Sequence, residues 1–216
     1  MITFDTVCKA YTPDVPILVK SSFTIQEWSF VSVMGPSWTG KTTILNLIAG
    51  LVRPDSGSIM LWSQQIEQLD DDTMTRLRWS MISFIFQQFY LLPQLTVEEN
   101  IDLWVQLNWL ERRFSTNKIL QKVWLEGRNR AYPTELSWWE QQRVAVARAF
   151  VGATPILLAD EPTGNLDINT AREIMNLMQS LQQEVWNTIV MITHDQAIAN
   201  YATQHYTLID TTLRDE

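Results

Sequence analysis

The chain has 216 residues, 46% of them hydrophobic, with a single cysteine and a formal net charge of −8. This composition predicts one large packed domain, or two lobes sharing a core. It excludes a disordered chain, and the acidic charge disfavours nucleic acid as a partner. No run approaches about 18 uncharged apolar residues, residues 1–5 lack the features of a signal peptide, and Cys8 cannot form an internal disulfide, so we expect a cytoplasmic protein.

The first segments of the chain read as short strands separated by turns. Strands are expected at 4–9 and 23–25, with a loop at 12–16 between them. Further along, we expect a turn at 53–57, a strand at 58–62, a short polar helix after the acidic run 70–72, and a strand at 81–86.

A phosphate-binding loop lies between a buried strand at 30–34 and a helix at 42–49 that Gly50 closes. Its eight residues, GPSWTGKT, match the pattern G-x-x-x-x-G-K-[ST]. In this pattern backbone N–H groups surround the phosphates, Lys41 neutralises their charge and the Thr42 hydroxyl can ligate Mg²⁺, while the helix N-terminus adds partial positive charge. The nucleotide-binding residues predicted here are Gly35, Pro36, Ser37, Trp38, Thr39, Gly40, Lys41, Thr42 and Thr43.

From 96 to 136 the pattern is helical, and after it strands and helices alternate again. A capping box at Thr96 opens the first helix, and Ser115 and Ser137 begin two more. Strands are then expected at 156–159, 188–192 and 206–209, and helices at 168–183 and 196–202. Strands that alternate with helices predict a mostly parallel α/β sheet, so the helical stretch is an inserted subdomain. We expect one domain, 1–216, with its α/β core at about 1–90 and 150–216 and the helical subdomain and third helix at 91–149.

Two adjacent carboxylates follow the expected strand at 156–159. Asp160 and Glu161 leave that strand at its carboxyl end, where α/β proteins place their ligands. Asp160 is placed to hold Mg²⁺, and Glu161 to polarise the water that attacks a γ-phosphate. Alone, such a pair is an ordinary acidic junction, but the phosphate loop upstream makes a nucleotide site the better interpretation.

Residues 136–143, LSWWEQQR, resemble the signature motif of the ATP-binding-cassette (ABC) ATPases, L-S-G-G-[QE]-x-x-R. The resemblance covers essentially the whole chain in the family's order. It implies a P-loop NTPase core, a mostly parallel sheet with an N-terminal antiparallel β part, and an inserted α-helical subdomain. Segments 86–89 and 160–167 further resemble the branch that includes lipoprotein-release, macrolide-export and cell-division ATPases.

The resemblance also assigns roles to single residues. Tyr11 matches the aromatic residue that stacks on adenine, and Asp167 lies in the loop that crosses the dimer interface. The implied catalytic residues are Glu161, His194 and Gln87, and the implied Mg²⁺ ligands are Thr42, Gln87 and Asp160. Ser137, Trp138, Trp139 and Glu140 would face the ATP held by a second copy.

The implied protein is an ATPase that binds ATP and Mg²⁺ in a head-to-tail homodimer or pseudo-dimer. One phosphate loop leaves one side of the γ-phosphate uncovered, and a second copy covers it. A separate transmembrane permease subunit would sit on the Gln87 loop and the helical subdomain, placing the chain at the cytoplasmic face of the inner or plasma membrane.

Tryptophan stands where the family has glycine at Trp38, Trp138 and Trp139, and the same holds by resemblance at Trp28, Trp124 and Trp186. The chain has only 7 glycines but 10 tryptophans. Tryptophan in glycine positions links the low number of glycines to the high number of tryptophans. Two interpretations stay open. In one, the indoles obstruct the closing face and turnover is impaired. In the other, they point away and turnover survives.

Two other function classes compete with the transporter ATPase. A nucleotide-gated binding module without turnover would bind ATP and release it unchanged. A soluble cassette acting on ribosomes or DNA usually carries two cassettes or a long coiled-coil insertion, and neither feature is found in these 216 residues. His205 is expected to be an ordinary loop histidine with satisfied hydrogen bonds and no functional role.

Overall fold

The computed structural model describes residues 1–12, 14–36, 39–108 and 111–215. Two residues of the expected phosphate site, Ser37 and Trp38, therefore lie outside the described residues.

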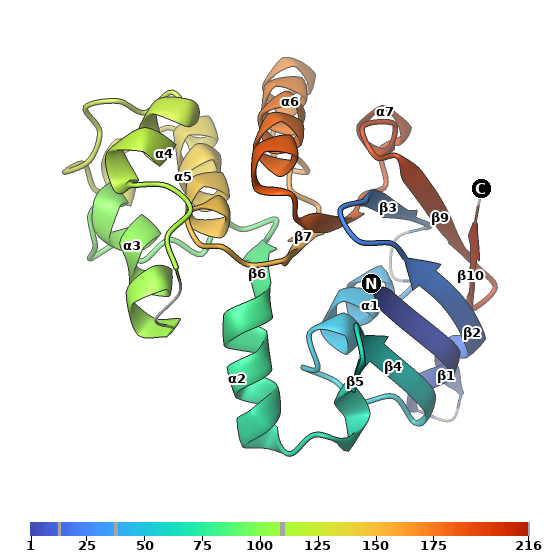
Figure 1. Ribbon diagram of the computed structural model, residues 1–216. Coiled ribbons are helices and arrows are strands. Elements are labelled where there is room, and N and C mark those ends of the chain that lie inside the picture. The colour runs from blue at the N-terminus through green and yellow to red at the C-terminus, as the bar shows by residue number, and fades with distance from the viewer. Residues whose placement is uncertain (13, 37–38, 109–110, 216) are drawn as a thin grey trace.

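A six-stranded, mostly parallel sheet forms the centre of the molecule, as expected (Figure 1). Its strands lie in the order β10-β9-β3-β8-β7-β6, and only the β10–β9 pair is antiparallel. Their bounds are β3 Phe30–Met34, β6 Ile82–Ile85, β7 Ile156–Asp160, β8 Thr188–Ile192, β9 Gln204–Ile209 and β10 Thr212–Asp215.

The expected antiparallel part is a second sheet of four strands in the order β2-β1-β4-β5. Its strands are β1 Ile2–Thr12, β2 Val15–Ile25, β4 Ser56–Leu61 and β5 Gln64–Gln65. The loop expected at 12–16 was too long, because Val15 and Pro16 already pair in β2. β2 thus starts earlier than its apolar residues indicated.

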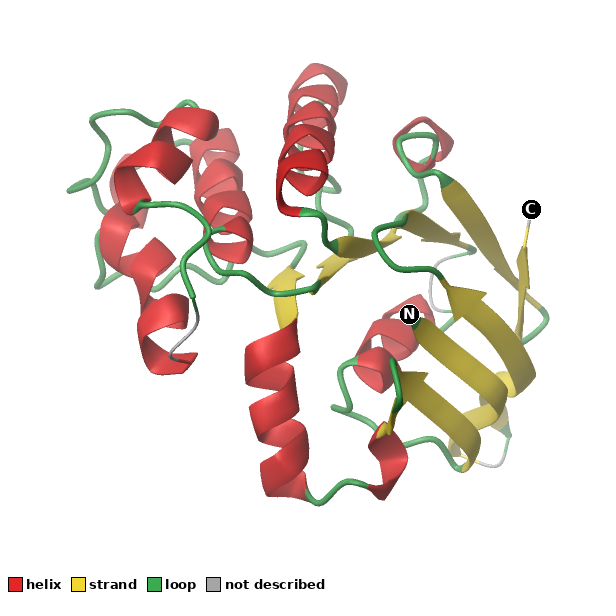
Figure 2. Ribbon diagram, in the orientation of Figure 1, coloured by secondary structure: helices red, strands yellow, loops and turns green. Residues whose placement is uncertain are grey.

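Seven α-helices and two short 3₁₀ turns are found in the described ranges (Figure 2). They are α1 Lys41–Ile48, α2 Asp71–Met81, α3 Val97–Asn108, α4 Thr116–Lys122, α5 Trp138–Phe150, α6 Ile168–Val185 and α7 Gln196–Ala199, with 3₁₀ turns at Ile66–Gln68 and Pro133–Glu135. Figure 1 shows α3, α4 and α5 grouped beyond the β6 edge, and α5 also packs against α6. The expected boundaries of this subdomain, at residues 91 and 149, stay a prediction.

Both faces of the central sheet are buried, which explains the unbroken apolar strands. Along β7, Leu157 and Ala159 pack with α5 and α6, whereas Ile156 and Leu158 pack with α1 and the antiparallel sheet. This alternation follows from the two-residue period of a strand, and burial on both sides is typical of parallel sheets. The sheet is therefore a rigid base for whatever its strand ends carry. No helix within the described ranges is long and apolar enough to cross a bilayer.

Candidate functional site

Neighbouring parallel strands bring the expected site residues to one edge of the sheet. β3, β8 and β7 lie side by side, and their carboxyl ends lead into the phosphate loop, His194 and the Asp160–Glu161 pair. The ends are tied together, because Glu161 N donates to Ile192 O (3.0 Å) and Thr193 N donates to Val33 O (3.3 Å). β6, next to β7, ends two residues before Gln87.

Gly40 begins α1 in a conformation that requires glycine. Its φ is 91°, and a Cβ there would lie 2.3 Å from Cγ2 of Ile17. The first turn of α1 contains no acidic side chain, so no carboxylate of that turn competes for its N–H groups. This end of α1 is therefore suited to an anion.

Lys41 is buried and lies across the phosphate loop. Its Nζ donates to the carbonyl oxygens of Gly35 (2.8 Å) and Pro36 (2.7 Å). Burial lowers the pKa of Lys41, and the negative charges of Glu161 and Asp160 oppose that shift. The ammonium group is thus held where a bound phosphate would supply the compensating charge.

Thr42 and Asp160 are joined by a hydrogen bond, with Thr42 Oγ1 donating to Asp160 Oδ2 over 3.0 Å. Burial raises the pKa of Asp160, whereas the Thr42 hydroxyl acts in the opposite direction. A hydroxyl and a carboxylate this close offer the hard oxygen ligands that Mg²⁺ prefers, so the donor set fits that ion.

The three expected catalytic residues meet around Gly164. His194 Nδ1 lies 2.6 Å from Glu161 Oε2. A Cβ on Gly164 would lie 3.2 Å from Gln87 Nε2 and 3.3 Å from Glu161 Oε2, so the absent side chain lets both approach. Glu161, Gly164 and His194 also line a hollow of about 180 Å³. A carboxylate and an imidazole thus border a space that can hold a water molecule, and the Gln87 amide lies beside Gly164, which also lines that space.

Tyr11 comes from the antiparallel sheet and reaches the start of α1. Its hydroxyl lies 3.2 Å from Thr43 Oγ1, while its ring is largely exposed. Lys9 Nζ lies 5.9 Å from the ring centre. An exposed aromatic face beside the phosphate loop is compatible with stacking on a base, which remains a prediction.

The signature residues form the N-terminus of α5. Ser137 and Glu140 make a capping contact, in which Ser137 Oγ donates to Glu140 Oε2 (2.6 Å) and Ser137 N donates to the same oxygen (2.9 Å). The hydrogen bond from Ser137 lowers the pKa of Glu140. Trp138 and Trp139 are 62% and 50% exposed, and the Trp138 ring lies 5.3 Å from that of Phe89. This helix end therefore presents two indoles to its surroundings.

Two expected residues have structural partners. Asp167 caps α6, accepting hydrogen bonds from Asn169 N (3.0 Å) and Thr170 N (3.2 Å). His205 was expected in a loop but lies in β9, where its Nδ1 is 2.9 Å from Ser32 Oγ. The dimer role of Asp167 stays a prediction. The hydrogen bond expected for His205 is present, but its expected place in a loop was wrong.

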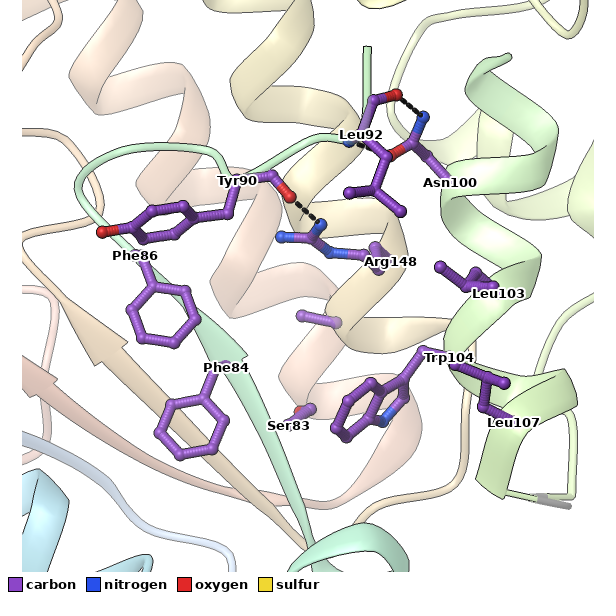
Figure 3. Close-up of a pocket in the computed structure, with 11 residues that line it drawn as sticks. Ser83, Phe84, Phe86, Tyr90, Leu92, Asn100, Leu103, Trp104, Leu107 and Arg148 are labelled. Carbon is purple, nitrogen blue, oxygen red and sulfur yellow. Dashed lines mark hydrogen bonds between the residues drawn. The ribbon is translucent and has the colours of Figure 1, made fainter. Parts of the chain in front are cut away.

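Two features near the site are not predicted from the sequence, Asn165 and an apolar cleft. Asn165 Nδ2 donates to Gln87 O (2.9 Å) and fixes the Gln87 loop. The cleft, of about 410 Å³, lies between β6 with its following loop and α3 (Figure 3). Its lining includes Phe84, Phe86, Tyr90, Leu103, Trp104 and Leu107. The closely spaced aromatic residues at 84, 86 and 90 were the available signal.

Comparison with known proteins identifies the family. Residues 18–164 match the model of the ABC transporter family. The chain is 40% identical over 211 residues to the uncharacterized ABC transporter ATP-binding protein MJ0796 of Methanocaldococcus jannaschii, covering 93% of this chain and 90% of that protein. It is 37% identical over 198 residues to a lipoprotein-releasing system ATP-binding protein, LolD 1, of Chlorobium chlorochromatii, covering 90% and 80%.

Another relative is the macrolide export ATP-binding/permease protein MacB of Shigella flexneri, 37% identical over 191 residues, of whose length the chain covers 29%. Among solved structures, the dimeric MJ0796 cassette in a post-hydrolysis state with ADP and Pi matches with a TM-score of 0.88 and 36% identity, covering 100% of this chain and 98% of that one. Fold, motif order and relatives agree, so the chain belongs to the ABC transporter family and is an ATP-binding cassette ATPase.

Proposed function

We propose that this chain hydrolyses MgATP between two copies of itself and passes the resulting closure to a separate membrane protein. The observation that carries the proposal is the convergence of Lys41, Asp160, Glu161 and His194 at the ends of three adjacent parallel strands. Cation, carboxylates and imidazole at one edge are the groups that phosphoryl transfer to water requires.

Lys41 and the N-terminus of α1 hold the triphosphate. With ATP bound, Lys41 Nζ exchanges the carbonyl oxygens of Gly35 and Pro36 for phosphate oxygens, which compensates its buried charge. The exposed ring of Tyr11 stacks on the adenine. These contacts fix the γ-phosphate at the edge where the carboxylates lie.

Thr42, Asp160 and the amide oxygen of Gln87 would hold Mg²⁺. The 3.0 Å contact between Thr42 Oγ1 and Asp160 Oδ2 supports this assignment, because it places two hard oxygen atoms side by side. When bound, the ion neutralises charge on the β- and γ-phosphate oxygens.

Glu161 acts as the general base. Its carboxylate takes a proton as water attacks the γ-phosphorus, and the bond to the bridging oxygen breaks to release ADP. His194, 2.6 Å from Glu161 Oε2, orients that carboxylate and reaches the γ-phosphate. Asn165 holds the Gln87 loop beside the same hollow.

The second copy supplies Ser137 and the N-terminus of α5. A helix N-terminus with a serine hydroxyl is an anion-binding end, and in a head-to-tail dimer it would face the γ-phosphate of the other copy. Two solved structures similar to this chain are dimers, one of them with ADP and Pi bound, which supports this arrangement.

The apolar cleft is the docking site that we propose for a membrane subunit at the cytoplasmic face of the membrane. Its walls are held in place, because Arg148 donates to the carbonyl oxygens of Phe89 and Tyr90 (both 2.7 Å) and Asn100 bonds to both N and O of Leu92. Figure 3 shows Phe84 and Phe86 facing the open space opposite Trp104. One relative carries both ATP-binding and permease in its name, which supports a partner of this class.

The direct test is vanadate-sensitive ATP hydrolysis, measured as phosphate release by the purified chain and by its Glu161→Gln variant. We expect the variant to bind ATP but to lose about 10²–10⁴-fold in rate, the usual contribution of a general base. Glu173→Gln, which removes an exposed carboxylate of α6 that contacts Arg143 on α5, is the matched control and should keep the rate. If Glu161→Gln hydrolyses ATP as fast as Glu173→Gln and the unaltered chain, Glu161 is not the base.

A nucleotide-gated module without turnover is the second candidate. The observation that favours it is the exposure of Trp138 and Trp139 at the end of α5 that should close over a partner's ATP. ATP affinity without phosphate release in the unaltered chain would support this candidate.

A further inference from the structure

Four tryptophans adopt a backbone conformation that belongs to glycine. The φ angles are 61° at Trp28, 53° at Trp62, 55° at Trp124 and 56° at Trp186. Positive φ is uncommon for any residue with a side chain, and for a bulky one it is an outlier. One such residue needs a local explanation, whereas four of one type point to a common cause.

Trp124 occupies a position that glycine fills elsewhere in the same chain. After α4, Trp124 N donates to Gln121 O (3.1 Å) and Leu125 N donates to Leu120 O (2.8 Å). After α1, Gly50 N donates to Leu47 O (3.0 Å) and Leu51 N donates to Asn46 O (2.9 Å). Both are Schellman motifs, whose left-handed position is usually glycine, and the φ of Gly50 is 60°.

The other three also stand in glycine positions. Trp186 ends α6 as its left-handed cap. Trp62 is the first residue of the two-residue hairpin loop between β4 and β5, where a positive φ defines the II′ turn that has glycine first. Trp28 lies in the short turn between β2 and β3.

Three further tryptophans occupy motif positions for glycine. Trp38 lies in the phosphate loop, and Trp138 and Trp139 form the signature pair. By contrast, Trp79 and Trp104 lie inside α2 and α3, where a tryptophan is ordinary. Trp109 lies outside the described residues, and the other nine tryptophans divide into those in glycine positions and those in helix interiors.

We propose that residues 28, 38, 62, 124, 138, 139 and 186 are glycine in the protein that its own cells make. The common cause would be a codon, UGA, which differs from the tryptophan codon only in its third base and which different genetic codes assign to stop, tryptophan or glycine. In some cells UGA is decoded as glycine. If a gene from such cells is translated with a code that assigns UGA to tryptophan, tryptophan stands at each of these glycine positions and no other residue type is replaced. Restoring these seven would double the count of 7 glycines, bringing it near the usual share of about 7%.

The indoles contribute little packing that would argue for their selection. Trp28, Trp124, Trp138, Trp139 and Trp186 are each at least half exposed. The Trp28–Trp186 pair, with ring centroids 6.3 Å apart, lies at the surface, and Trp138 contacts Phe89. Five changes to a large exposed side chain, each in a glycine position, have no shared physical benefit.

This inference deepens the proposed function and rests on it for one consequence. Glycine at 138 and 139 leaves the N-terminus of α5 as bare backbone, so nothing obstructs its approach to a partner's γ-phosphate. The obstruction that favours a module without turnover is then absent from the protein in the cell.

Mass spectrometry of peptides from the protein isolated from its own cells tests the inference directly. We expect glycine at all seven positions and tryptophan at 79 and 104. Tryptophan at 124, 138, 139 and 186 would overturn it. The readout is residue identity, so this result is independent of whether the chain hydrolyses ATP.

Matched variants of the chain that carries tryptophan at these positions give a second test. Trp124→Gly and Trp186→Gly should each raise the midpoint of thermal unfolding, because glycine adopts positive φ without strain. Trp79→Gly and Trp104→Gly should each lower it, because glycine weakens a helix interior. A lower midpoint in all four variants would contradict the assignment.

Discussion

The sheet edge and the N-terminus of α5 differ in whether a single chain supplies all the groups that their proposed roles require. At the edge, Lys41, Asp160 and Glu161 are held by contacts from several strands and loops. At α5, the Ser137 hydroxyl bonds to Glu140 of its own helix. In the proposed function, the first region binds the triphosphate of its own chain, whereas the second contacts the triphosphate held by another copy. The difference explains why a cassette would work as a dimer.

Removing the cation at the edge should have the largest effect. We expect Lys41→Ala to lower the rate of ATP hydrolysis about 10³-fold and to weaken MgATP binding, since a buried positive group that contacts the phosphates is lost. Phosphate release and titration calorimetry measure the two effects. Lys122→Ala, which breaks an exposed ion pair with Glu184, is the control and should leave both unchanged. Wild-type heats from Lys41→Ala would place the triphosphate elsewhere.

Removing the hydroxyl at α5 should separate binding from turnover. We expect Ser137→Ala to reduce hydrolysis about 10²-fold while MgATP still binds, because the donor acts only in the dimer. Ser115→Ala, at the cap of α4, is the matched control, since each substitution removes a helix cap worth about 1 kcal/mol. If the two variants hydrolyse ATP equally, the comparison between the regions fails.

Replacing the buried carboxylate at the edge gives the smallest expected effect, on stability. The folded-state pKa of Asp160 is raised by burial, so the folded chain holds this proton more tightly than the unfolded chain does. The stability of the folded chain is therefore greatest below the pKa that Asp160 has in the unfolded chain, and it falls as pH rises through the pKa that Asp160 has in the folded chain. Without nucleotide, Asp160→Asn should therefore melt at a higher temperature at neutral pH, and the gain should vanish in acid.

Asp55 provides a control of opposite sign for that measurement. The hydrogen bond from Lys9 holds the pKa of Asp55 below its usual value, so its stabilisation is present above the unfolded pKa and is lost as pH falls through the folded one. Asp55→Asn should lower the melting temperature at neutral pH. A lower melting temperature at neutral pH in Asp160→Asn as well as in Asp55→Asn would mean that burial does not destabilise the Asp160 carboxylate.

Sequence predicted the edge well because its signals are local. The strand at 30–34, the phosphate loop and the strand at 188–192 each lie in one short segment with its own pattern, and the structure has both strands at the expected residues. Parallel pairing then brings their ends together as a consequence of strand direction. The roles of Gln87, Glu161 and His194 stay predictions, although Glu161 and His194 line one hollow and Gln87 lies beside Gly164 at its wall.

Other features could not be predicted because they depend on contacts between distant segments. The apolar cleft combines residues after β6 with residues of α3 and α5. β10 is recognisable only by its pairing with β9. Asn165 carries no pattern of its own, and its role in fixing the Gln87 loop appears only when the two loops meet.

The most direct test of the account mixes two inactive variants. Lys41→Ala lacks the phosphate cation and Ser137→Ala lacks the α5 hydroxyl, so a head-to-tail pair formed from one of each contains one site with both groups intact. We predict that the mixture hydrolyses ATP well above either variant alone, measured as phosphate release at equal total protein. A mixture as inactive as its components would contradict a site shared between two copies.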